Sequence, residues 1–158
     1  MQKGETRMKL AEALHLRADL QKRIAQTRER LKLNSKVQEG DTPSEDPEVL
    51  LEELNRDTER LQQLIAQINL TNSKIESEGV TLTEMIAKKD VLSLKTSILR
   101  EFLQEASEKI ERYSNKEIRI LSTVDVQKLQ KEVDQMSQEL RILDVKLQSL
   151  NWSVDLIK

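Results

Sequence analysis

The stretch VQKLQKEVDQMSQELRILDVKLQSLNWSVDLI, residues 126–157, decides the fold of this chain. Ten apolar residues recur in it at alternating spacings of three and four: Val126, Leu129, Val133, Met136, Leu140, Leu143, Leu147, Leu150, Val154 and Ile157. This spacing keeps side chains on one side of a helix, and a sustained seven-residue repeat is typical of a helix–helix seam. Because only 37% of the chain is hydrophobic, the uninterrupted series indicates a long helix packed along its whole length against another.

Composition supports a helical protein of ordinary size. The chain has 158 residues, 34% of them charged, with three Gly and two Pro, so it favours helices and contains few helix breakers. It has no Cys, which excludes disulfides, thiolate metal ligands and cysteine nucleophiles. No apolar run approaches the roughly 20 residues of a membrane span, and the N-terminal sequence lacks a signal-peptide core. We therefore expect a cytoplasmic protein with no membrane partner.

Similar apolar stripes predict three more helices. Asp46 is a suitable N-cap and Pro47 fits a first helical turn. Capping signals also precede the third and fourth helices: Thr81 with Glu84, and Ser122 with Asp125. We predict an N-terminal extension and a single helical-bundle domain, with these bounds: 1–7 and 8–158, and helices at about 6–32, 47–76, 82–113 and 124–157. The predicted fold is all-α, a bundle of four long helices with coiled-coil-like antiparallel packing, assembled as a homo-oligomer.

Segments between the helices carry turn signals. Residues 34–46 are rich in Ser, Gly, Pro and acids, which is typical of a surface loop. Glu78-Gly79 indicates a turn before the third helix. Residues 117–120, Glu-Ile-Arg-Ile, alternate with period two, but four residues are too few to predict a strand.

Charge is distributed unevenly along the chain, although the net charge is −2. Residues 1–36 carry ten Lys or Arg against four Asp or Glu, and residues 37–80 carry three against eleven. Opposite charge on adjacent segments favours two helices docked side by side. In an antiparallel hairpin of the first two helices, Asp57 lies level with Arg23 and Arg28, and we predict an ion pair with one of them.

Several polar residues interrupt or border the apolar stripes: Arg17, Asp57, Asn69, Thr71, Asn72, Lys89 and Asp90. One interpretation is that they set helix register and partner choice, as buried polar residues do in coiled coils. The alternative is that they converge on a small-ligand pocket inside the bundle. We favour the first, and the identity of any small-molecule ligand is left open.

The third helix carries two apolar stripes, and the second of them consists of Ala87, Val91, Leu94, Ile98 and Phe102. A helix that is apolar on two sides is central in a bundle or lies between subunits. The predicted oligomer interface comprises residues of this stripe and of the C-terminal end: Val91, Leu94, Ile98, Phe102, Trp152, Val154 and Ile157.

Residues for catalysis are scarce. Glu12 and His15 have the i, i+3 spacing of di-iron bundles, but His15 is the single histidine, so only a symmetric dimer could supply a second pair. The glycines are scattered and form no phosphate-binding loop. We predict no enzyme activity, no metal site and no cofactor.

Nucleic-acid binding is the alternative function, and it would use basic residues of the first helix and its flanks: Arg7, Lys9, Lys22, Arg23, Arg28, Arg30, Lys32 and Lys36. The net negative charge and the aromatic content of 2% disfavour it, because single-stranded nucleic acids stack on aromatic side chains. Our first hypothesis is a non-enzymatic, oligomeric helical-bundle protein that acts through protein–protein surfaces.

Short stretches along nearly the whole chain resemble a septicolysin-like family of small all-helical bacterial proteins, an uncharacterised family named after a corynebacterial member. The stretches are Met8–Leu14, Leu16–Ile24, Val37–Gly40, Glu45–Pro47, Ile68–Asn72, Thr81–Glu84, Lys89–Leu92, Ser122–Val126 and Asn151-Trp152. The resemblance implies a helical protein without an established activity. The family name alone implies a membrane-active toxin, which is our third hypothesis.

Overall fold

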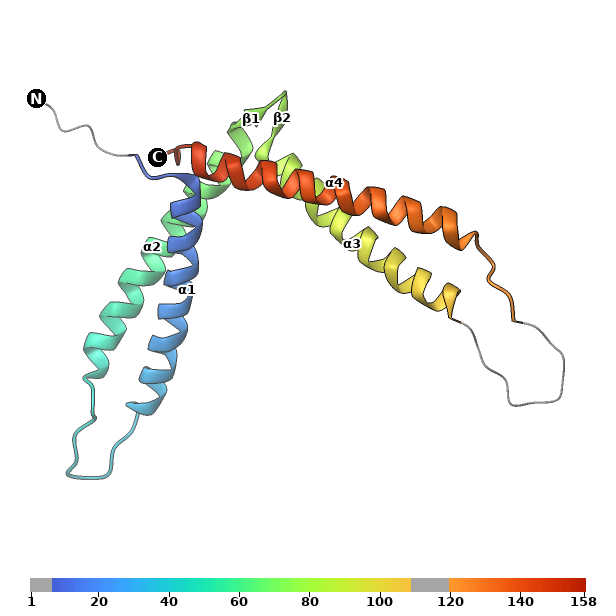
Figure 1. Ribbon diagram of the computed structural model, residues 1–158. Helices are drawn as coiled ribbons and strands as arrows, with labels where there is room; N and C mark the ends of the chain where they lie inside the picture. Colours follow the sequence, from blue (N-terminus) through green and yellow to red (C-terminus); the bar gives the residue numbers. More distant parts are fainter. Residues whose placement is uncertain (1–6, 109–119) are drawn as a thin grey trace, which may run out of the picture. The chain divides into compact units, whose positions relative to one another are not determined.

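The structure is a computed structural model that describes residues 7–108 and 120–158. Its described part contains four long helices and one short β-hairpin (Figure 1). The elements are α1 (Leu10–Leu33), α2 (Pro47–Lys74), β1 (Glu76–Ser77), β2 (Val80–Thr81), α3 (Leu82–Ser107) and α4 (Val126–Ser153). The predicted all-α fold with four long packed helices is confirmed. None of the helices in this part of the chain is both long and apolar enough to cross a membrane.

The chain divides into two compact units. The first comprises Met1–Leu82 and Gln148–Lys158, and the second comprises Thr83–Leu147. The first unit therefore contains α1, α2, the hairpin and the last turns of α4, whereas the second contains nearly all of α3 and most of α4.

An antiparallel pair of helices, α1 and α2, makes up most of the first unit (Figure 1). Their facing stripes meet in a core whose largest side chains are fully buried: Leu10, Leu20, Leu50, Leu64 and Ile68. Burying each such side chain contributes about 1.5–3 kcal/mol relative to leaving it in water. The apolar stripes of the two helices therefore supply the core of this contact.

The predicted start of α2 is confirmed in detail. Asp46 Oδ1 accepts a hydrogen bond from the Glu48 backbone N–H at 2.9 Å, and Pro47 occupies the first helical turn. A carboxylate cap satisfies one of the free N–H groups at a helix start, and proline lacks the N–H that would need a partner.

The turn at Glu78-Gly79 is also present, within a β-hairpin that the sequence did not predict. Glu78 and Gly79 have φ angles of 56° and 78°, and Ser77 pairs with Val80 across them. Two central residues with positive φ match the twist of an antiparallel hairpin. Each strand has only two residues, which is too short to show a period-two pattern.

The last helix ends before its apolar spacing does. α4 ends at Ser153, and the following residues run beside the start of α1. Leu10 donates its backbone N–H to the Val154 carbonyl at 2.9 Å, and Leu156 donates to the Met8 carbonyl at 2.8 Å. Because the first N–H groups of a helix have no partner inside it, α1 gains an acceptor from this C-terminal segment.

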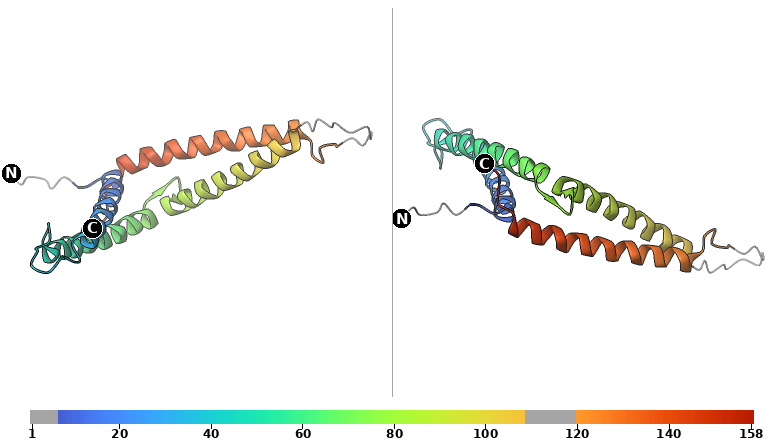
Figure 2. Two further views of the ribbon diagram at one scale, coloured as in Figure 1. Left: turned by 90° about the horizontal axis from the view of Figure 1, so that it is seen from below. Right: turned by 90° about the horizontal axis from the view of Figure 1, so that it is seen from above.

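Helices α3 and α4 form the second unit as another antiparallel pair, side by side in both views of Figure 2. Lys88 Nζ lies 2.7 Å from Glu139 Oε1, and Lys89 pairs with Asp144. The capping role of Asp125 is confirmed, since its Oδ1 accepts the Lys128 N–H at 3.0 Å. The predicted continuation of the third helix to Tyr113 and most of the period-two stretch at 117–120 lie outside the described residues.

Candidate interaction surfaces

One side of α3 is packed and the other is open. Four of its buried and half-buried residues, Leu92, Thr96, Leu99 and Leu103, form one stripe. The exposed large apolar residues of α3 form what we call the outer stripe, with exposed fractions of 65%, 62%, 55% and 44% for Val91, Leu94, Ile98 and Phe102. Their spacing of three and four places them on one side of the helix. Four of the seven residues of the predicted oligomer interface therefore form an open apolar surface.

The C-terminal interface candidates have neighbours within their own unit. Val154 and Ile157 are half-buried and hydrogen-bonded to α1 and α2 through their backbones. Trp152 is 56% exposed, and the centroid of its ring lies 6.1 Å from that of His15. These three residues anchor the end of the chain, so the outer stripe is the better candidate for a contact with another molecule.

Three of the polar candidates make contacts that join separate segments of the chain. Asp57 Oδ1 lies 3.3 Å from Arg23 Nη2, which confirms one of the two predicted ion pairs. Thr71 is buried and binds the backbone of the C-terminal segment. Lys89 pairs with Asp144 between α3 and α4. Such contacts suit a role in helix register.

The other four polar candidates are distributed over three helices, Arg17 on α1, Asn69 and Asn72 on α2, and Asp90 on α3. Arg17 and Asn72 are half-buried, while Asn69 and Asp90 are exposed. Two grooves of about 1170 Å³ and 1080 Å³ open in the first unit. Of the seven polar candidates, Asp57 alone lines either groove. The candidates therefore do not converge on one of these grooves.

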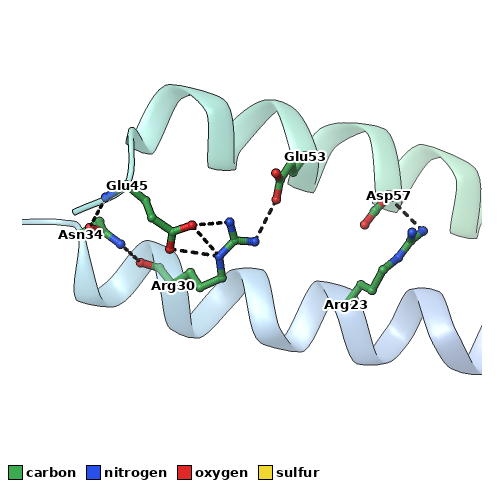
Figure 3. A network of polar contacts seen from close by, with 6 residues as sticks. All are labelled: Arg23, Arg30, Asn34, Glu45, Glu53 and Asp57. Carbon is green, nitrogen blue, oxygen red and sulfur yellow. Dashed lines mark hydrogen bonds and ion pairs between the residues drawn. The ribbon is translucent and has the colours of Figure 1, made fainter. Parts of the chain in front are cut away.

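A network of charged groups closes the end of the α1–α2 hairpin (Figure 3). Arg30 Nε donates to both carboxylate oxygens of Glu45, at 3.0 and 3.1 Å, and Arg30 Nη1 donates to Glu53 Oε2 at 3.0 Å. Asn34 Oδ1 accepts the Glu45 N–H at 3.0 Å. Hydrogen bonding to Arg30 lowers the pKa of the Glu45 carboxyl, and the same contact raises the pKa of Arg30. Sequence reasoning missed these partners; the signal was the opposite charge of the two segments.

The two candidate metal ligands, Glu12 and His15, both have neighbours within the first unit. Glu12 Oε2 accepts the Lys9 backbone N–H at 2.7 Å, which stabilises the start of α1. His15 is exposed and lies near Trp152. Over residues 7–108 and 120–158, no group of three or more His, Asp or Glu side chains is placed to hold a metal ion.

Comparison with models of known protein families assigns the chain to a family. Residues 17–156, which include all of α2, α3 and α4 and most of α1, match a family of unknown function, DUF6847. The chain belongs to DUF6847. The predicted membership of a septicolysin-like family is wrong, because the match is to this family and the solved relative carries no such description. Several of the stretches behind that prediction are helix starts and polar caps, which helical proteins of different families share.

One solved structure resembles this DUF6847 chain closely. It is a functionally unknown conserved protein from Corynebacterium diphtheriae, 38% identical in sequence, with a TM-score of 0.86. The alignment covers 96% of this chain and 100% of the other. A comparison with curated proteins gives no match.

Proposed function

We propose that this DUF6847 protein is a non-enzymatic, homo-oligomeric helical protein that acts through protein–protein surfaces, with the outer stripe of α3 as its interface. The observation that carries the proposal is the exposure of Val91, Leu94, Ile98 and Phe102 along one helix side. Single exposed apolar residues are normal on proteins, but a contiguous row of large ones marks an interaction site.

The energetics favour a partner on this surface. A fully exposed large apolar side chain gains about 1.5–3 kcal/mol on burial, and these four are roughly half exposed, so each would gain about 1 kcal/mol. Association also costs rigid-body freedom and side-chain order. The outer stripe by itself therefore supports a reversible contact. Polar groups beside it would have to contribute further binding free energy for a tight one.

The contacts of the basic residues argue against the nucleic-acid alternative. Lys9, Arg23, Arg30 and Lys32 are in ion pairs with acids of the same chain. Cations that are already paired release fewer counterions from a phosphate backbone. We therefore rank self-association above nucleic-acid binding, and we propose the cytoplasm as the place where it occurs.

The test is the mass of the protein in solution. Leu94→Gln with Ile98→Gln removes the centre of the outer stripe, while glutamine preserves helix propensity at exposed sites. We expect light scattering to show an oligomer for the natural chain and an apparent Kd about 1000-fold weaker for the variant, because a contact between two variant copies loses four side chains at about 1 kcal/mol each.

A matched control is available on the neighbouring helix. Val145 of α4 is 68% exposed and lies outside the outer stripe, so Val145→Gln should leave the mass unchanged. Circular dichroism should show the same helix content for all three proteins. A natural chain that is monomeric at high concentration, or a stripe variant that assembles normally, contradicts the proposal.

A further inference from the structure

We propose that two copies of the chain pair through α3 in antiparallel orientation, with Ala87 of one copy opposite Glu105 of the other. This inference rests on the proposed function, because it assumes self-association through the outer stripe. It adds the direction in which the two helices run, and that direction follows from the residues at the two ends of the stripe.

Seven-residue spacing extends the stripe in both directions. Ala87 lies seven residues before Leu94, and Glu101 lies seven residues after it. Glu105 in turn lies seven residues after Ile98. The same side of α3 is thus small and apolar toward its start and acidic toward its end. All these side chains are exposed.

A parallel pair in register would bring acids together. Each residue at a seam position of a parallel pair faces its own copy. Glu101 would face Glu101 and Glu105 would face Glu105 of the second molecule, and like charges held opposite each other are destabilising. No basic residue lies between Glu101 and Glu105 in the sequence that could offset this repulsion.

An antiparallel pair removes these two clashes. With Leu94 opposite Ile98 of the second copy, Glu105 faces Ala87 and Glu101 faces Val91. Ala87 is small, so the longer Glu105 side chain has room and can keep its carboxylate toward solvent. Asp90 approaches Glu101 only at the solvent edge of this contact, where salt screens repulsion.

Two-fold symmetry makes each favourable contact occur twice. An antiparallel pair of identical helices has its axis perpendicular to them, which gives the isologous interface that is commonest among homo-oligomers. The centre of the contact falls between Leu94 and Ile98, the middle of the outer stripe. The most apolar part of the surface thus lies on the axis, and both acidic ends lie at the rim.

Disulfide trapping tests the direction, because the natural chain contains no cysteine and an introduced one has no competitor. Ala87→Cys and Glu105→Cys proteins are prepared separately, mixed, allowed to exchange subunits and oxidised gently. We expect a disulfide-linked pair that contains one of each. Neither variant alone should link, because its two cysteines would be roughly 27 Å apart, given 18 residues at 1.5 Å, whereas a disulfide needs Cα atoms within about 7 Å.

The outcomes separate this inference from the proposed function. Efficient self-linking of Ala87→Cys alone indicates a parallel pair and overturns the antiparallel order. Failure of the mixture to link while light scattering still shows an oligomer also overturns it, but leaves self-association standing. A monomer at all concentrations overturns both. A mixture of Val145→Cys with Glu105→Cys is the control that should not link.

Discussion

The Thr71 hydroxyl accepts a hydrogen bond from the backbone N–H of Ile157 at 3.0 Å, across 86 positions of the chain. The same hydroxyl donates to the Gln67 carbonyl of its own helix at 2.8 Å. Thr71 is fully buried, so one polar side chain in the α2 stripe holds the C-terminal segment against the first unit. A polar residue in an apolar stripe here selects one arrangement of the chain end.

Replacing Thr71 by Val should destabilise the first unit by about 1–2 kcal/mol, because valine has the same shape but leaves the Ile157 N–H without its acceptor. Urea unfolding followed by circular dichroism gives the free energy, and hydrogen exchange at the Ile157 amide reports the lost bond directly. Thr96→Val is the control: Thr96 is also buried and donates to the carbonyl four residues earlier, but its hydroxyl accepts no backbone N–H from a distant segment of the described chain. Equal amide protection in Thr71→Val and the natural chain would contradict the assigned role.

The Arg23–Asp57 pair should couple α1 and α2 by about 0.5–1 kcal/mol, the range for partly exposed ion pairs. The Asp57 side chain is 13% exposed and that of Arg23 56%, so water screens the contact incompletely. A double-mutant cycle with Asp57→Asn and Arg23→Gln measures the coupling, which should fall as salt is raised.

The Lys32–Glu29 pair gives the comparison for this cycle. Both of its side chains are more than half exposed and lie within one helix, so its coupling should be nearer 0.2–0.5 kcal/mol. If Asp57→Asn changes neither the free energy of unfolding nor the mass in solution, Asp57 has no part in setting the register of the hairpin.

Much of the fold could be predicted because the helices repeat one signal many times. The ten-residue series that ends at Ile157 predicts α4, yet the helix ends at Ser153. Beyond it, the Val154 carbonyl accepts from Leu10 and the Leu156 N–H donates to Met8, just before α1, in place of further helical bonds. No local pattern reveals that choice. The β-hairpin was missed for a related reason: its turn has a sequence signal, but its two-residue strands do not.

The interaction surface was predicted less completely. Sequence periodicity shows two apolar stripes on α3 and cannot tell which of them packs inside the chain, since Leu92 and Leu99 are as apolar as Leu94 and Ile98. That choice depends on the register with α4, which the ion pair of Lys89 with Asp144 helps to select. The partners of Arg30 were likewise not identified: opposite charge on the two segments indicates that they attract, but the pairing depends on how the loop after Asn34 brings Glu45 back to α1.

Glu12 should matter through its cap, and the conservative variant separates this from any other role. Glu12→Ala removes the acceptor of the Lys9 N–H and should destabilise α1 by about 0.5–1.5 kcal/mol. Glu12→Gln keeps an acceptor of the kind found in capping boxes, so its stability should stay close to that of the natural chain. Thermal unfolding distinguishes the two. An equal loss in both variants would mean that the carboxylate charge, and not the hydrogen bond, is what α1 requires.

The Arg30–Glu45 contact should make the stability of the α1–α2 hairpin depend on pH in the acidic range. Hydrogen bonding to Arg30 lowers the pKa of Glu45 below its ordinary value of 4.5 in the folded chain. A carboxyl with a lowered folded pKa contributes stability that is complete above the unfolded value and is lost as pH falls through the folded one. The free-energy difference between the natural chain and Glu45→Gln should therefore be constant near neutral pH and shrink below about pH 4.5. In an Arg30→Gln background that acid-dependent difference should largely disappear. Parallel pH profiles for the natural chain and Glu45→Gln would show that the guanidinium does not hold this carboxylate in solution.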